Sequence, residues 1–172
     1  TSGNVGITAS VPLIPVAEGY NSSEEDLIRG LALSYLLSIY VKSHIGRLSA
    51  LCACAIASGI GIAAATSFLI DKDNYEKIEM SIKNLVGSIA GVFCDGAKYG
   101  CALKLSSAVG IAIESAMLAD VGICIPDRDG LVCENADETI AMIGRIASKG
   151  MIQTDEYIAK EIIERENSLN IK

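Results

Sequence analysis

The stretch from Leu48 to Ile70 contains no charged residue, and this run constrains the fold more than any other feature of the chain. It is long enough to cross a bilayer as a helix. However, it contains glycine, serine, threonine and many alanine residues, and it lacks the aromatic belt that marks membrane-spanning helices. We therefore expect a helix buried at the centre of a bundle, and no membrane partner.

The composition of the whole chain also favours packed helices. Its 172 residues fit one domain with room for a core, and 51% hydrophobic residues exclude a disordered chain. The apolar residues are mostly alanine, isoleucine, leucine and valine, with no tryptophan and only two phenylalanines. Such small side chains suit closely packed helices better than a β-sandwich. We predict a single all-α domain over residues 1–172, a compact bundle of about six helices.

Hydrophobic periodicity and helix breakers place these helices along the chain. The predicted helices are Glu24–Ser43, Leu48–Ile70, Tyr75–Phe93, Tyr99–Leu118, Asp137–Ser148 and Asp155–Glu166. Residues 1–20 are punctuated by glycine and proline and are expected to form a loop, as is the turn-rich segment Ile125–Asn135. Ser22 and Glu25 form the expected capping box of the first helix, and Thr154 is the expected N-cap of the last.

The first helix has apolar residues at four-residue steps, and we expect this stripe to face the core. The stripe consists of Leu27, Leu31, Tyr35 and Ile39, with Ile28, Leu36 and Tyr40 beside it. Gly46 is expected to end the helix.

The net charge and the N-terminal residues indicate which partners and which cellular location to expect. The net charge is −7, and the lysine and arginine residues are scattered, so no basic patch points to nucleic acid. Residues Thr1–Gly6 lack the basic region of a signal peptide, so we expect a cytoplasmic protein. In that setting the six cysteines favour metal binding or catalysis over disulfides. Because the chain opens at Thr1 and not at methionine, we expect a piece of a longer polypeptide.

Helical geometry indicates which of four cysteines can face a common site. Cys52 and Cys54 are two residues apart and point to nearly opposite sides of a helix, so only one can face a given site. Cys94 and Cys101 would lie about 10 Å apart along an unbroken helix at 1.5 Å per residue. The Asp95-Gly96 break allows a turn that brings both sulfurs toward one point.

The remaining two cysteines, Cys124 and Cys133, flank the Pro126–Gly130 turn and fit ordinary thiols. No CxxC pair is present, so a zinc ribbon or ferredoxin-type cluster is not indicated. From spacing alone, all six cysteines can equally be small buried hydrophobic residues.

Several longer motifs resemble the serine dehydratase α-chain family, and more narrowly its single-chain L-cysteine desulfidase branch. They are the run Gly46–Gly59, Ile82-Lys83-Asn84 with Gly87, Cys94–Lys98 with Gly100–Lys104, and Ser2-Gly3-Asn4 with Gly6-Ile7. The resemblance extends over residues 1 to about 125 and matches the C-terminal portion of family members.

The resemblance implies a four-iron–four-sulfur (4Fe-4S) cluster held by three cysteines, spaced forty and then seven residues apart in the desulfidase branch. Cys54, Cys94 and Cys101 reproduce these gaps, whereas Cys52 does not. With three thiolate ligands, one iron keeps an open position for substrate. The implied reaction is the α,β-elimination of L-serine or L-cysteine to pyruvate and ammonia, with sulfide released from cysteine.

The same resemblance bears on the substrate, the base and the cofactor. It favours Ser2, Gly3 and Asn4 as a loop that holds the substrate carboxylate. The branch's proposed catalytic base is a cysteine in the N-terminal region that this chain lacks, so we expect the chain to be inactive alone and able to form a homodimer through an uncovered apolar face. Lysines near the motifs are common at helix ends, and we expect no pyridoxal phosphate. These lysines are Lys42, Lys98 and Lys104.

Two other interpretations of the sequence remain open. One is a non-catalytic helical assembly or regulatory module with structural cysteines, and the other is a small membrane protein that spans with Leu48–Ile70. His44 and Arg47 fit a helix end better than a catalytic pair. Asp95, beside a proposed ligand, fits either a tuning role or the start of a turn.

Overall fold

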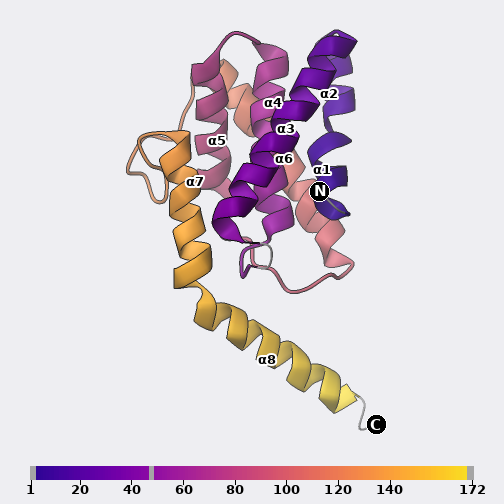
Figure 1. Ribbon diagram of the computed structural model, residues 1–172, viewed down its shortest axis with the longest axis vertical. Coiled ribbons are helices and arrows are strands. Elements are labelled where there is room, and N and C mark those ends of the chain that lie inside the picture. Colours follow the sequence, from indigo (N-terminus) through magenta and orange to yellow (C-terminus); the bar gives the residue numbers. More distant parts are fainter. Residues whose placement is uncertain (1–2, 47–48, 170–172) are drawn as a thin grey trace.

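The computed structural model describes residues 3–46 and 49–169, and these form an all-α bundle (Figure 1). The elements are α1 (Asn4–Ser10), α2 (Leu13–Gly19), α3 (Glu24–Ile45), α4 (Ala53–Ile70), α5 (Tyr75–Ile89), α6 (Gly100–Asp120), α7 (Ala136–Arg145), a π-helical turn (Ile146–Gly150) and α8 (Ile152–Leu169). Within the described ranges there is no β-strand, and one isolated antiparallel bridge joins Leu51 and Phe93. The predicted all-α class is confirmed.

Helix α4 lies at the centre of the bundle. Its side chains are buried over 14 of its 18 residues, and it packs against α1, α2, α3, α5 and α6. Because the helix carries no charge, all of its faces can be covered by other helices without burying an unpaired ion. The predicted central apolar helix is therefore confirmed.

Two helices, α4 and α6, are long and apolar enough to cross a membrane by length and composition alone. They differ in their surroundings. In α4, 78% of the most apolar 18-residue segment is buried inside the bundle, whereas in α6 only 22% of the corresponding segment is buried. Sequence analysis had singled out only the first of these two helices.

The close contact between α3 and α4 requires a glycine. A Cβ atom on Gly61 would lie 2.5 Å from the backbone oxygen of Ser34 and 2.8 Å from the hydroxyl oxygen of Ser38. The Ser34 hydroxyl donates to the Ala9 carbonyl at 2.7 Å, and the Ser38 hydroxyl donates to the Ala57 carbonyl at 3.2 Å. Small residues thus let α3 approach α4 while their hydroxyls remain hydrogen-bonded.

The predicted inward stripe of α3 is confirmed only in part, because Leu27 and Leu31 are partly buried against the core and Ile39 is exposed. The buried residues of the helix are Gly30, Ser34, Ser38, Val41 and Ile45, whereas Ile28, Leu36, Ile39 and Tyr40 are exposed. The reason is steric: a backbone this close to α4 has room only for small side chains along most of the shared face. The larger apolar side chains of the stripe therefore lie at the edge of this face or outside it.

The N-terminal segment is also helical where a loop was predicted. Pro12 precedes α2 and Pro15 lies in its first turn, and both positions tolerate proline because first-turn amides need no intrahelical partner. In α1, Val5, Thr8 and Ala9 are buried and hold the helix against the bundle. The glycines and prolines of this segment therefore mark helix starts and not a loop.

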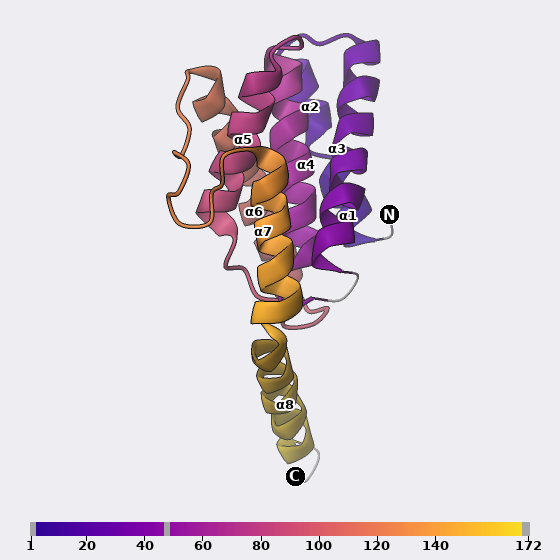
Figure 2. The ribbon, with the colours of Figure 1, turned by 60° about the vertical axis from the view of Figure 1, so that its left-hand side comes forward.

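Helix ends differ from the predicted ones by a few residues. The capping box of α3 is Ser23 with Asp26, one residue later than expected, and Gly46 ends the helix at φ +87° as predicted. Thr154 lies inside α8, which begins two residues before it. Helix α8 projects away from the bundle beyond the π-helical turn (Figure 2).

Replacement of Gly61 by alanine tests the close contact of α3 and α4. We expect Gly61→Ala to lower the free energy of unfolding by about 1–3 kcal/mol, because the new methyl group overlaps the Ser34 backbone. The control is Gly110→Ala in α6, where a Cβ meets no atom of the described residues within 4 Å and helix propensity should add about 0.5–1 kcal/mol. Urea unfolding measures both, and equal effects would contradict the contact.

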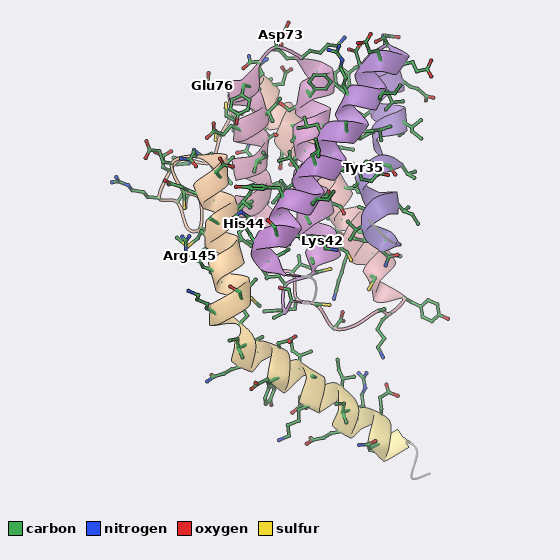
Figure 3. All side chains as sticks on the ribbon, viewed as in Figure 1. Tyr35, Lys42, His44, Asp73, Glu76 and Arg145 are labelled. Carbon is green, nitrogen blue, oxygen red and sulfur yellow. The ribbon has the colours of Figure 1, made fainter. Side chains whose placement is uncertain are left out.

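The stability that the N-terminal cap of α3 provides depends on pH through the ionisation of Asp26. The Lys72 ammonium and the Ser23 hydroxyl lower the pKa of Asp26 from 3.8 to about 2. Because the folded pKa is the lower one, its stabilising contribution is present above pH 3.8 and is lost as the pH falls toward about 2. We expect Asp26→Asn to flatten the fall of Tm over this range. Asp73→Asn, in the turn before α5 (Figure 3), should retain the wild-type slope, and identical slopes for all three proteins would refute the effect.

Candidate metal centre

Four of the six cysteines gather at one end of the bundle. Cys52 is the N-cap of α4, Cys54 is the second residue of that helix, Cys94 lies between α5 and α6, and Cys101 is the second residue of α6. Burial raises the pKa of the Cys52 and Cys54 thiols, and the charges of Cys94 and Cys101 add to the rise. Lys42, on the last turn of α3, lies at the same end (Figure 3).

A short antiparallel pairing brings the first three of these cysteines together. The Cys94 amide donates to the Ala50 carbonyl at 2.7 Å, and the Cys52 amide donates to the Val92 carbonyl at 2.8 Å. This pairing explains why α4 starts at Ala53 and α5 ends at Ile89, inside the predicted helices. The backbone needs an extended conformation to make these hydrogen bonds.

The break predicted at Asp95-Gly96 is present and precedes Cys101. Gly96 adopts φ +87°, which favours glycine. The Lys98 amide donates to the Cys101 sulfur at 3.5 Å, and the Cys101 thiol donates to the Gly96 carbonyl at 3.4 Å. Hydrogen bonds of this kind tune iron–sulfur centres when they reach a ligand sulfur.

Helix ends provide a second electrostatic influence on two of the thiols. Cys54 and Cys101 each lie in the first turn of a helix, of 18 and 21 residues respectively. The positive end of the helix dipole stabilises a thiolate there. At Cys54 burial outweighs this influence and raises the pKa of the thiol.

Exposure separates Cys52 from the three cysteines with the forty-and-seven spacing. Cys52 is 5% exposed and belongs to the hydrophobic core, whereas Cys54, Cys94 and Cys101 are partly exposed. Among these four thiols, Cys52 is therefore the one that the core encloses.

In the part of the chain that the structure describes, the cysteines do not form a site for a single metal ion. Among residues 3–46 and 49–169, no three histidine, cysteine or carboxylate side chains are close enough to hold one metal ion. The thiolates of an iron–sulfur cluster bind different irons and therefore lie farther apart than the ligands of one ion. Soft sulfur donors without nearby carboxylate ligands also select such clusters.

Lys104 fixes the segment that carries Cys94. Its ammonium group donates to the Phe93 carbonyl at 3.0 Å and forms an ion pair with Asp95. The hydrogen bond from Lys104 lowers the pKa of Asp95, and the Asp95 carboxylate in turn raises the pKa of Lys104. Asp95 therefore starts the turn and holds Lys104 in place.

An open groove of about 910 Å³ lies beside Cys101. Helix α1 contributes Asn4, Ile7 and Thr8 to its walls, and α6 contributes Cys101 and Leu105. Asn4, one of the proposed substrate-binding residues, therefore borders the same groove as a proposed cluster ligand. Gly3 precedes it as the N-cap of α1 at φ +59°, while Ser2 lies outside the described residues.

The Lys83-Asn84 motif serves the loop before α7 and not the cysteine site. Lys83 is buried and donates to Asp127 at 3.1 Å and to the Glu134 carbonyl at 3.2 Å. Asn84 donates to the Ile123 carbonyl at 2.8 Å and accepts from the Ile125 amide at 2.8 Å. A conspicuous sequence motif here has a structural role.

The other residues considered from the sequence lie elsewhere. Cys124 and Cys133 flank the same loop and are partly buried. His44 packs edge-on against Tyr40, with ring centroids 4.8 Å apart, as expected for a residue at a helix end. Arg47 lies outside the described residues. Sequence analysis missed the part that Thr8 and Ile7 play in the groove, because it treated this segment as a loop.

The comparison with protein families identifies the chain. The family model described as serine dehydratase alpha chain matches residues 1–160. The chain belongs to the serine dehydratase alpha chain family. This confirms the resemblance found in the sequence.

Relatives in this family are considerably longer. A UPF0597 protein of Desulfotalea psychrophila is 38% identical over 159 residues, which cover 92% of this chain and 36% of the relative. A UPF0597 protein of Clostridium tetani is 40% identical over 166 residues, covering 96% and 39%. One of Phocaeicola vulgatus is 43% identical over 157 residues, covering 91% and 36%. The chain thus spans less than two fifths of these relatives, and no solved structure matches it.

Proposed function

We propose that this chain carries the iron–sulfur centre of a lyase that converts L-serine or L-cysteine to pyruvate and ammonia, with sulfide released from cysteine. Its membership of the serine dehydratase alpha chain family supports the reaction class. The observation that carries the proposal is the shared groove: Asn4 and Cys101 line one open groove.

In this proposal Cys54, Cys94 and Cys101 hold a 4Fe-4S cluster. When bound, such a cluster supplies a Lewis acid at the iron that lacks a cysteine ligand, which assists departure of the hydroxyl or thiol group. The raised pKa of Cys54 does not oppose this assignment, because metal coordination deprotonates a thiol outright. Cys52, buried in the core, supports the first turn of α4 and is not a ligand.

The groove provides the other contacts to the substrate. The Asn4 side-chain amide donates to the substrate carboxylate. Lys98 also lines the groove, with its ammonium 3.9 Å from the Glu166 carboxylate. The apolar side chains of Ile7 and Leu105 limit the access of water to the reacting atoms. A groove of this size accepts a small amino acid with room to spare.

The described lining of the groove contains no carboxylate or imidazole group to take the α-proton. We therefore propose that the base comes from a part of the longer enzyme, and that the 172-residue chain alone does not produce pyruvate. We also propose a cytoplasmic location, where the thiols stay reduced.

Anaerobic reconstitution with iron and sulfide tests the ligand set. We expect about four irons per chain and an absorbance shoulder near about 400 nm, both typical of thiolate-bound clusters. Cys54→Ser, Cys94→Ser and Cys101→Ser should each lose most of the iron, because each removes one of three ligands.

Cys52→Ser is the matched control and should retain the cluster. Circular dichroism of each variant separates loss of iron from loss of folding. A cluster lost from Cys52→Ser but retained in Cys54→Ser would contradict the assignment, and so would a folded wild-type chain that takes up no iron.

The groove assignment predicts binding of substrate to the reconstituted chain. We expect L-serine to bind with an affinity that Asn4→Ala weakens about tenfold, the order expected for one hydrogen bond to a charged group. Titration calorimetry measures it, with Asn167→Ala on the exposed face of α8 as the control that should not change the affinity. Equal affinities for both variants would remove Asn4 from the site.

A further inference from the structure

The groove shared by Asn4 and Cys101 opens on a face with large apolar side chains in solvent. Ile7 is 62% exposed, Val11 is 54% exposed and Tyr99 is fully exposed, and all three line the groove. Scattered apolar residues are normal on a protein surface, but several around one groove mark a contact surface.

Helix α6 adds to this uncovered surface. Its inner side packs against α4 and α5. However, only 22% of its most apolar 18-residue segment is buried, compared with 78% of the corresponding segment of α4. Leu103, four residues after Tyr99, is 73% exposed. We call the surface formed by Ile7, Val11 and Tyr99 the groove face.

Small residues recur along the outer side of α6 with the same four-residue spacing as the small residues of α3 that pack against α4. Ala102, Ser106 and Gly110 are exposed and recur every four residues. Gly30, Ser34 and Ser38 recur in the same way along α3, where the two serines meet Gly61 of the buried helix α4. By this comparison, the outer side of α6 has room for a further helix at short range.

We propose that the groove face binds the part of the enzyme that the longer relatives contain outside the matched region. The relatives have more than half of their length outside the matched region, which is ample to cover this surface. The proposal extends the proposed function, because the covering part would lie over the groove whose own lining has no carboxylate or imidazole base.

A second copy of this chain is a poorer occupant of the same face. Pairing two groove faces would close one groove against the other, and it would add neither a carboxylate nor an imidazole from the lining residues. The site would then be covered but still incomplete.

Co-expression tests the proposal. The tagged chain is produced together with the portion of the Clostridium tetani relative that lies outside its match, and the amount of that portion retained on the tag is measured. We expect retention at equal stoichiometry, and a loss of at least about tenfold in Ile7→Glu, because a buried unpaired carboxylate opposes the contact. Ile163→Glu, at a residue of α8 that is 59% exposed, is the matched control and should retain the partner.

Retention is measured on iron-free protein, so failure of the cluster assignment would leave this result standing. Circular dichroism confirms that each variant is folded. Equal retention by Ile7→Glu and Ile163→Glu would overturn the proposal, as would the absence of any retention. A homodimer of the chain that Ile7→Glu dissociates would assign the face to a second copy instead.

Discussion

The burial of α4 along most of its length is the constraint on which the rest of the structure depends. A helix without charge must be covered on all sides, and α1, α2, α3, α5 and α6 together provide that cover. The cover is close because glycine and serine line the contact with α3. Since α4 is fixed along its length, its first turn presents Cys54 at a defined place at the end of the bundle.

Two structural features position the cysteines at one end of the bundle: a short antiparallel bridge and a turn held by an ion pair. The Leu51–Phe93 bridge joins two segments that are far apart in the sequence and sets Cys94 beside the start of α4. The turn at Gly96, held by the Lys104–Asp95 ion pair, leads into α6 and Cys101. Rigid helices and one short pairing thus hold the thiols, while the groove next to them stays open on the outer surface.

The sequence predicted those features that depend on local chemistry. The uncharged run predicted the central helix, Gly46 and Asp95-Gly96 predicted breaks, and the family motifs predicted the family. Features that depend on long-range contacts were missed. The bridge at Leu51 leaves no periodic pattern, and the buried face of α3 was set by how closely α4 approaches and not by hydrophobicity. The ligand set and Asn4 rest on spacing and resemblance, and the structure adds the partial exposure of the three cysteines and the groove that Asn4 shares with Cys101.

The most direct test of the account is Mössbauer spectroscopy of the chain reconstituted with isotopically enriched iron. The central claim is a cluster with three cysteine ligands and one iron open to the substrate. It predicts one iron site that differs from the other three and that changes when L-serine or L-cysteine is added, but not when D-serine is added. Four equivalent irons that no amino acid affects would contradict the claim.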